Sequence, residues 1–175
     1  METDIGELLA RVRRLEDLEA IRTSWRDYCI QLDSGDMAGL GDVFTEDAVL
    51  EMDGLDSLGG KVDGVYRGRG AIIGDFYSQV GTRAALNDRG RFSTGHLSTN
   101  MQIDLQGDEA TTLAYFFEIV ADDIVLIGTY QHRLRRDADR WRFAFLRIAV
   151  RYKARITASE VGGQTLRDVL AKPKP

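Results

Sequence analysis

Apolar residues recur every three or four positions in the first part of the chain, which is the spacing of one buried helix face. They predict a long helix over about 16–33, preceded by a shorter helical turn around 5–13. Gly35 suits the end of this helix and Asp36 the cap of the next, which we expect over 37–44. The apolar positions of the long helix are Leu15, Leu18, Ile21, Trp25, Tyr28, Cys29 and Leu32.

The second half of the chain alternates apolar and polar residues as β-strands do. Short connections rich in Asp and Gly make consecutive strands antiparallel neighbours. A third helix is expected over 69–80. Helices followed by a twisted sheet indicate an α+β fold, in which the helices cover one face and a cavity lies between the layers. The predicted strands cover 48–52, 65–68, 92–106, 110–121, 123–136 and 140–155.

Composition narrows the class of protein. The chain has 175 residues, enough for one domain, and its net charge of −5 gives no basic surface for nucleic acid. We expect a domain over 1–156 and a partly disordered tail over 157–175, with some helix at 165–171. The chain has neither a membrane-spanning apolar run nor a signal peptide, so we expect a cytoplasmic protein. With one Cys and two His, no metal-ligand spacing occurs, and neither a metal nor a cofactor is expected.

One of the two histidines, His96, lies in the segment "STGHLSTN". Alternation places Thr94, His96, Ser98 and Asn100 on one face of a strand. Imidazole titrates near neutral pH and suits proton transfer, and Asn100 can donate a hydrogen bond to a carbonyl or an oxyanion. The apolar residues from Ile103 onward, however, continue the opposite face. Either a bulge shifts the face within this strand, or His96 points outward.

Two residues near the end of the long helix complement His96. Tyr28 belongs to the apolar stripe, and Asp33 lies where the helix ends and can turn toward the cavity. A carboxylate bonded to one imidazole nitrogen fixes the tautomer and makes the other nitrogen a better base. By position alone, Tyr28 is equally a core residue and Asp33 equally a solvated turn residue.

Several segments, in order and spacing, resemble the SnoaL-like branch of the nuclear transport factor 2-like (cystatin-like α+β) superfamily. Members include scytalone dehydratase, bile acid 7α-dehydratase, lindane dehydrochlorinase, ketosteroid-isomerase-like enzymes and polyketide cyclases. The resemblance implies a cone-shaped α+β barrel, with N-terminal helices packed in the concave face of a curved, mainly antiparallel sheet. The matching segments read "IRTSWRDYCIQLDSGDMAGLGDVFTEDAVLEM", "YRGRGAIIGDF", "GHLSTNMQIDLQGDEATTLAYF", "GTYQHRL" and "DADRWRFAFLR".

The resemblance also implies roles for particular residues. Several dehydratase-type members use a helix aspartate paired with a strand histidine as the base, without a cofactor, and Asp33 and His96 match that pair. Tyr28 matches a tyrosine of the bile acid enzyme, and Asn100 matches a common His-x-x-x-Asn pattern. His132 in "GTYQH" stands where the family often has an aspartate.

The candidate catalytic residues are therefore His96, Asp33 and Tyr28. An arginine often follows the last-strand tryptophan by five residues, but Arg147 comes one position later, so its direction and that of His132 are left open. The candidate substrate-binding residues are Asn100, His132, Tyr130, Trp25 and Arg147.

These features predict a cofactor-independent lyase or isomerase acting on a small hydrophobic, cyclic substrate, with elimination, isomerisation and cyclisation all open. Two other classes fit the same fold: a non-catalytic small-molecule-binding module, and a structural subunit resembling the small subunit of ring-hydroxylating dioxygenases. The strands over 110–121 and 140–155 are apolar on both faces, which predicts a homodimer or homotrimer through the outer sheet face.

Overall fold

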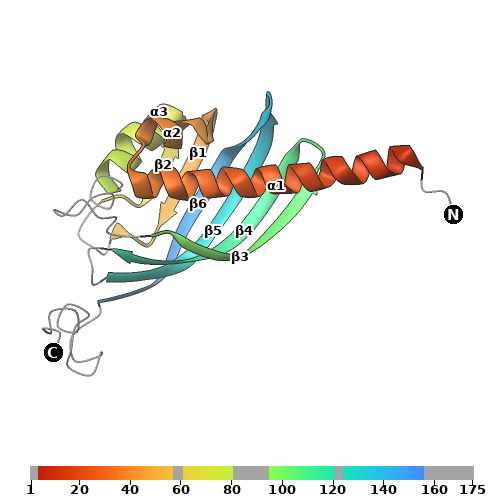
Figure 1. Cartoon of the computed structure of the whole chain (residues 1–175). Coiled ribbons are helices and arrows are strands. Elements are labelled where there is room, and N and C mark those ends of the chain that lie inside the picture. The colour runs from red at the N-terminus through yellow and green to blue at the C-terminus, as the bar shows by residue number, and fades with distance from the viewer. Residues whose placement is uncertain (1–3, 57–60, 81–94, 121–123, 156–175) are drawn as a thin grey trace, which may run out of the picture.

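Figure 1 shows the computed structural model, which describes residues 4–56, 61–80, 95–120 and 124–155. The predicted tail over 157–175 lies outside these residues. None of the described helices is both long and apolar enough to cross a membrane. The elements are α1 (Ile5–Ser34), α2 (Met37–Asp42), β1 (Phe44–Asp53), β2 (Gly64–Arg67), α3 (Arg69–Ala71), the π-helical turn η2 (Ile72–Tyr77), β3 (Leu97–Gln106), β4 (Glu109–Val120), β5 (Ile124–Asp137) and β6 (Arg140–Arg155).

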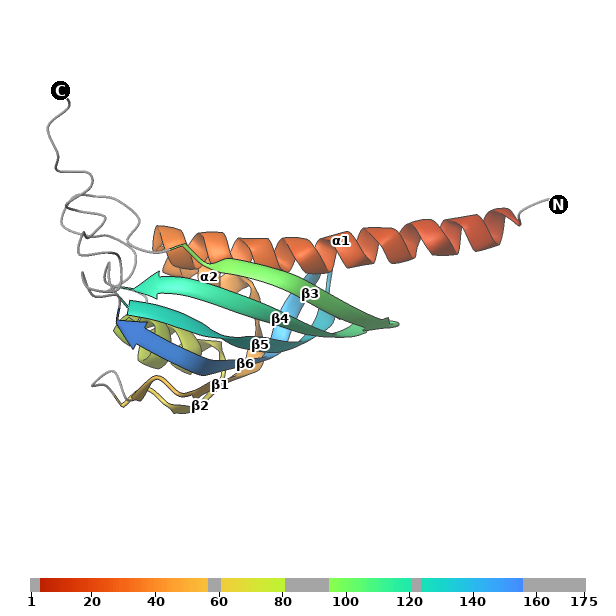
Figure 2. The ribbon, with the colours of Figure 1, turned by 90° about the horizontal axis from the view of Figure 1, so that it is seen from below.

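The six strands form one curved, open sheet in the order β2-β1-β6-β5-β4-β3. All neighbours are antiparallel except β1 and β6, which run parallel. Helix α1 lies along the concave side, and the short helices gather at the β1 and β2 side of the sheet (Figures 1 and 2). This is the α+β architecture that the sequence predicts, with helices packed in the concave face of a curved, mainly antiparallel sheet.

Helix α1 is longer than the sequence predicts. The two expected pieces are one continuous helix of 30 residues, because no helix-breaking residue separates them. The Asp4 side chain caps its start by accepting from the Gly6 backbone N–H. The face turned toward the sheet buries Ile21, Trp25, Tyr28 and Leu32, as the apolar stripe predicts. Leu15, which the sequence assigned to the same stripe, is instead 65% exposed, because the helix extends beyond the sheet there (Figure 1).

Strand β1 starts earlier than expected, at Phe44 rather than at residue 48. Phe44 and Thr45 are fully buried, and Phe44 pairs with Phe143 of β6. The predicted helix over 37–44 accordingly ends at Asp42 as α2. The remaining strands lie close to their predicted bounds, although residues 92–94 of the third predicted strand fall outside the described part of the chain.

A β-bulge at Asn100 reverses the facing of side chains along β3. The β3–β4 register shifts between Thr99 and Gln102, and Asn100 has a positive φ of 55°. Asparagine tolerates this left-handed conformation better than most residues. Before the bulge, His96 is on the concave side, and beyond it Ile103 pairs with the buried Thr112 on that same side. The bulge is therefore the correct one of the two explanations for the broken alternation.

Gly128 on β5 allows a large side chain to cross the strand. A Cβ at this position would lie 2.1 Å from the Ala149 carbonyl oxygen and 2.5 Å from the Phe116 ring. Phe116 uses this space to pack against Tyr130, with ring centroids 4.6 Å apart. The glycine of the "GTYQH" segment therefore serves the packing of the concave core.

Candidate active site

Asp33 and His96 meet where α1 ends. Gly35 ends the helix in a left-handed conformation, with a φ of 74°, and leaves Asp33 in the last turn. Oδ1 of Asp33 lies 2.5 Å from Nδ1 of His96, and Oδ2 accepts a hydrogen bond of 3.1 Å from the His96 backbone N–H. One carboxylate thus holds both the ring and the main chain of His96. The contact between these side chains is the one that the sequence predicts.

A second carboxylate, Glu118 of β4, lies on the other side of the imidazole ring. Leu97 pairs with Phe117 in the antiparallel register of β3 and β4, which puts His96 opposite Glu118. Oε1 of Glu118 is 3.7 Å from Nε2 of His96, and the two side chains are 13% and 7% exposed. The imidazole therefore lies between two acidic groups, and Nε2 makes no hydrogen bond to the described residues.

Burial and charge act in opposite directions on the pKa of His96. Burial lowers it, but the hydrogen bond to Asp33 and the charge of Glu118 raise it more, so the pKa lies above its ordinary value. Burial raises the pKa of the Glu118 carboxyl, the nearby His96 lowers it and the charge of Asp33 raises it, with a net increase. Both groups hold a proton more strongly than they would in water.

The hydroxyl of Tyr28 is paired with that of Tyr77 from η2 at 2.9 Å. Both tyrosines are fully buried, and the Tyr28 ring lies edge-on to His96 with centroids 6.3 Å apart. Burial raises the pKa of both phenols. Both phenols therefore stay protonated near neutral pH. Because the Tyr77 O–H donates to Tyr28, the Tyr28 O–H is the remaining donor of the pair beside the imidazole.

Trp25, Tyr130 and His132 form a buried aromatic cluster next to this site. The His132 ring stacks on Phe143 at a centroid distance of 4.9 Å and lies 4.7 Å from the Trp25 ring. Its Nδ1 is 2.5 Å from Thr112 Oγ1, while Nε2 has no partner among the described residues. Burial lowers the pKa of His132 to about 3, so this imidazole is neutral. The orientation that the sequence left open is now clear: His132 faces the concave side.

Two candidate substrate-binding residues do not join the site. Asn100 occupies the bulge, and its exposed amide oxygen accepts a hydrogen bond from Thr99. Arg147 follows the fully buried Leu146 on β6, and successive side chains of a strand point to opposite faces. Arg147 therefore points to the outer face, where it lies 3.7 Å from Asp53. The one-residue offset of this arginine from the family position is enough to turn it away from His96.

Sequence reasoning missed Glu118 and Tyr77. Glu118 lies in "TTLAYFFEIV", a segment that is apolar on both faces. The sequence feature that could have indicated Glu118 is its alternation with Ala114 and Phe116, which are buried. Tyr77 lies in the helix predicted over 69–80, and no local sequence feature marks it as a site residue. Ser98, which alternation placed with His96, has a buried Oγ without a partner among the described residues.

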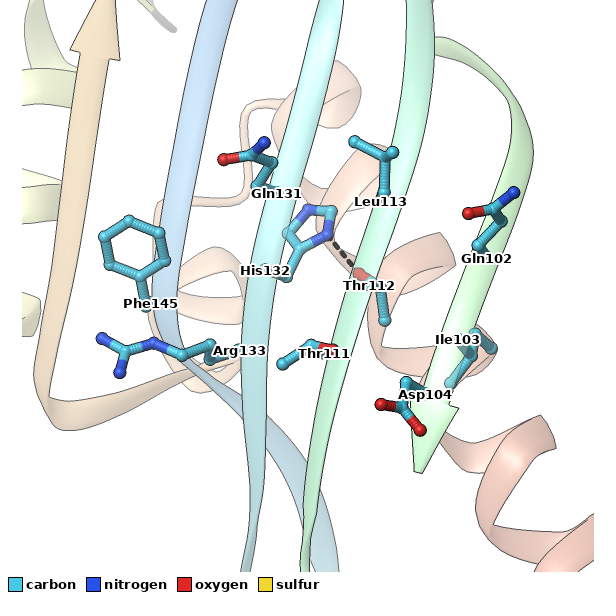
Figure 3. Close-up of a pocket in the computed structure, with 10 residues that line it drawn as sticks. All are labelled: Gln102, Ile103, Asp104, Thr111, Thr112, Leu113, Gln131, His132, Arg133 and Phe145. Atoms are coloured by element: carbon cyan, nitrogen blue, oxygen red, sulfur yellow. Dashed lines mark hydrogen bonds between the residues drawn. The ribbon is translucent and has the colours of Figure 1, made fainter. Parts of the chain in front are cut away.

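A separate groove lies on the outer face of the sheet, where β3, β4, β5 and β6 run side by side (Figure 3). Its volume is about 500 Å³. Arg133 in this groove lies over the Phe145 ring, with its guanidinium carbon 4.9 Å from the ring centroid. Most of the lining side chains belong to the outer face, opposite the Asp33–His96 pair. They are Gln102, Asp104, Thr111, Leu113, Gln131, Arg133 and Phe145.

A model of the SnoaL-like domain matches residues 13–147. The chain belongs to the SnoaL-like family. This matched segment of the SnoaL-like chain contains Tyr28, Asp33, His96 and Glu118. A comparison with curated protein sequences gave no match. Within the described part of the SnoaL-like protein, no three His, Cys, Asp or Glu side chains gather as metal ligands would.

Solved structures similar to this SnoaL-like protein share its fold at low sequence identity. A scytalone dehydratase-like protein of Novosphingobium aromaticivorans DSM 12444 is 21% identical, with a TM-score of 0.66 over 82% of this chain and 90% of that one. The hexachlorocyclohexane dehydrochlorinase LinA-type3 of Novosphingobium barchaimii LL02 is 18% identical, with a TM-score of 0.68 over 84% and 94%. A protein of N. aromaticivorans described as NTF2-like with a cystatin-like fold is 24% identical, with a TM-score of 0.64 over 86% and 92%.

Proposed function

We propose that the protein is a cofactor-independent lyase or isomerase that removes a proton from a small hydrophobic, cyclic substrate. The contact that carries this proposal is the 2.5 Å distance between Asp33 Oδ1 and His96 Nδ1. With Nδ1–H donating to the carboxylate, the lone pair of the neutral ring lies on Nε2. Nε2 is the nitrogen without a hydrogen bond to the described residues, so it is free to take a proton from carbon.

Proton abstraction leaves an electron pair on the substrate and a positive charge on His96. The imidazolium then lies between Asp33 and Glu118, and these two carboxylates stabilise it. The electron pair enters a new double bond: in an elimination the leaving group departs from the neighbouring carbon, and in an isomerisation the proton returns to a different carbon. The Tyr28 hydroxyl, held by Tyr77, can donate to the oxygen on which negative charge develops.

The side chains buried beside the site support the proposed substrate class. Trp25, Tyr130 and the neutral His132 give the concave side flat, apolar surfaces, and Ser98 offers one hydroxyl without a partner among the described residues. Such a lining favours a ring-shaped hydrophobic molecule with few polar groups. The dehydrochlorinase and the scytalone dehydratase-like protein among the similar structures have names that denote elimination reactions, which is consistent with this proposal.

Proton exchange tests the proposal before the true substrate is known. A panel of small cyclic ketones is incubated with the protein in D2O, and loss of the α-proton signal is followed by ¹H NMR. We expect exchange above the buffer rate for at least one ketone, and none above it with His96→Gln. Saturable binding of the same ketones without exchange would instead favour the non-catalytic binding module.

We also propose that copies of the chain associate through the outer sheet face. Leu97, Phe117, Ile127 and Tyr152 are register neighbours across four strands and are 63%, 38%, 37% and 55% exposed. Tyr115, also on this face, is 50% exposed. A continuous apolar patch of this kind is typical of a surface that binds another protein.

A further inference from the structure

The first turns of α1 project beyond the sheet (Figures 1 and 2), and Arg14 near the end of this segment donates a hydrogen bond of 3.2 Å to the Leu105 carbonyl of β3. We call residues 4–16 the arm, because every one of them is exposed. The side chains of Ile5, Leu8, Val12 and Leu15 are nevertheless apolar and are 74%, 51%, 42% and 65% exposed. These four residues line one side of the helix, and Leu9, which is 52% exposed, lies at their edge, so the arm has an apolar surface that no described residue covers.

These four residues, the arm stripe, do not continue the buried face of α1. A helix turns by about 100° per residue, which puts the centre of the arm stripe roughly 150° from the face of Ile21, Trp25, Tyr28 and Leu32. The arm stripe thus points away from the protein's own core.

The repeat that defines the arm stripe stops where the helix meets the sheet. Its next two positions are Glu19 and Arg22, which form an exposed ion pair at 3.6 Å. The SnoaL-like domain match begins only at residue 13, so most of the arm lies outside the family domain. The arm stripe is therefore separate from the buried face by which α1 packs on the sheet.

We propose that the arm pairs with the arm of a second copy of this chain, in antiparallel orientation. The spacings between Ile5, Leu8, Val12 and Leu15 are three, four and three residues, which read the same in both directions. An antiparallel partner therefore places Ile5 opposite Leu15 and Leu8 opposite Val12, so each of the four residues of the arm stripe meets another apolar residue. This is the packing of two-stranded antiparallel helices, and it generates a two-fold axis near residue 10.

The charges of the arm favour another arm over a lipid surface. Residues 4–16 contain the acidic Asp4, Glu7 and Glu16 and the basic Arg11, Arg13 and Arg14, so the arm has no excess of positive charge to bind anionic lipid. With three acidic and three basic residues, the arm is neutral overall, so two arms can approach each other without net charge repulsion.

The size of the contact sets the expected strength. The apolar part of the arm is about 16 Å long, which is short for a standard protein–protein interface. We therefore expect association in the micromolar range or weaker, as an addition to any contact through the outer sheet face.

Sedimentation equilibrium over micromolar to submillimolar protein tests the pairing with one variant and a matched control. Leu8→Glu introduces a charge into the arm stripe and should weaken arm-dependent association by about tenfold or more. Ile30→Glu makes the same change at a residue of α1 that is 59% exposed but lies outside the arm, and it should leave association unchanged. Circular dichroism checks that both variants keep the helix. Equal association of wild type and Leu8→Glu would overturn the proposal.

Disulfide trapping tests the orientation. Leu8→Cys and Val12→Cys are prepared as separate proteins, and burial raises the pKa of the Cys29 thiol in both, which keeps it slow to oxidise. Mixing the two under mild oxidation should give far more disulfide-linked dimer than either protein alone, because antiparallel arms place residue 8 opposite residue 12. Equal or greater yield from each protein alone would overturn the antiparallel pairing. Co-sedimentation with anionic vesicles, without self-association, would assign the arm to a lipid surface instead.

Discussion

The carboxylate of Asp33 contacts His96 twice: Oδ1 lies 2.5 Å from the ring Nδ1, and Oδ2 accepts from the backbone N–H at 3.1 Å. The two residues are separated by 63 positions in the chain. Because one group holds both the main chain and the side chain, the ring has little freedom to rotate away. The end of α1 and the start of β3 are thereby joined at the point where the chemistry is proposed.

Replacing either member of this pair should abolish most of the proton exchange. His96→Gln removes the base, and we expect a loss of about 10² to 10⁴-fold in exchange rate. Asp33→Asn keeps the shape but removes the charge that fixes the tautomer, and we expect a loss of about 10²-fold or more. The readout is ketone α-proton exchange by NMR. Asp27→Asn, on the same helix, serves as the control and should retain the wild-type rate.

The pH dependence of exchange should report the titration of His96. As a base His96 must be neutral, so the rate should rise with pH and reach half its maximum above about 6.5, since the pKa of His96 is raised. Glu118→Gln removes one of the charges that raises this pKa and should move the midpoint to lower pH. NMR titration of the ring gives the pKa directly.

Glu109→Gln is the matched control for that pH shift, because Glu109 is an exposed residue at the other end of β4. It should leave the midpoint in place. An unchanged midpoint in Glu118→Gln would show that Glu118 does not act on His96.

The Tyr28–Tyr77 hydroxyl pair should couple in a double-mutant cycle. Tyr28→Phe or Tyr77→Phe alone leaves one buried hydroxyl without a partner and should lower the free energy of unfolding by about 1–3 kcal/mol. The double variant should lose less than the sum of the two. Urea unfolding measures these values, and additive losses would contradict the pairing. In the exchange assay Tyr28→Phe should remain active but slower, by on the order of 10²-fold, because its donor is lost.

His132 should make the protein less stable in acid. Its folded-state pKa is lowered to about 3, below the unfolded value of about 6.5, so the unfolded state binds the proton first as pH falls. The stability contributed by the neutral ring is full above about pH 6.5 and falls by about 1.4 kcal/mol per pH unit down to about pH 3. Between pH 7 and 5, urea unfolding should show a loss about 2 kcal/mol larger in wild type than in His132→Phe. Equal losses in both proteins would show that His132 titrates normally.

The outer sheet face should contribute to self-association. Phe117→Lys places a charge in the middle of the apolar row that runs from Leu97 to Tyr152, and it should lower the average mass in sedimentation velocity experiments. Val65→Lys is the control, since Val65 is 51% exposed but belongs to β2 at the opposite edge of the sheet. A wild-type protein that sediments only as monomer would count against this interface.

Much of the fold follows from local patterns in the sequence. The stripe through Trp25 and Tyr28 predicts the buried face of α1, and the alternation of the later segments predicts the strands. Helix α1 was expected in two pieces because the arm is apolar on a different side, so the two stripes do not join. The early start of β1 depends on the packing of Phe44 on Phe143, a contact about a hundred residues away in sequence that local periodicity does not carry.

The site was only partly predictable for the same reason. The Asp33–His96 contact came from a resemblance in spacing, and the structure contains it. Glu118 and Tyr77 reach His96 and Tyr28 through the strand register and the π-helical turn. The alternation of Glu118 with Ala114 and Phe116 indicates its face but not its neighbour on the next strand, and the π-helical turn has no local signal. Arg147 faces outward because successive side chains of a strand point to opposite faces. A position that differs by one residue from the family pattern therefore lies on the other face.

The bulge at Asn100 divides β3 into two segments whose side chains alternate in opposite phase. Before the bulge the even-numbered residues face the concave side, and after it the odd-numbered residues do. His96 at the proposed site and Ile103 in the core therefore both face the concave side. If the same residues paired regularly without the bulge, the two segments would be in conflict, since only one of them could keep its inward side chains. The position of the base therefore depends on the number of residues between it and the core as much as on their identity.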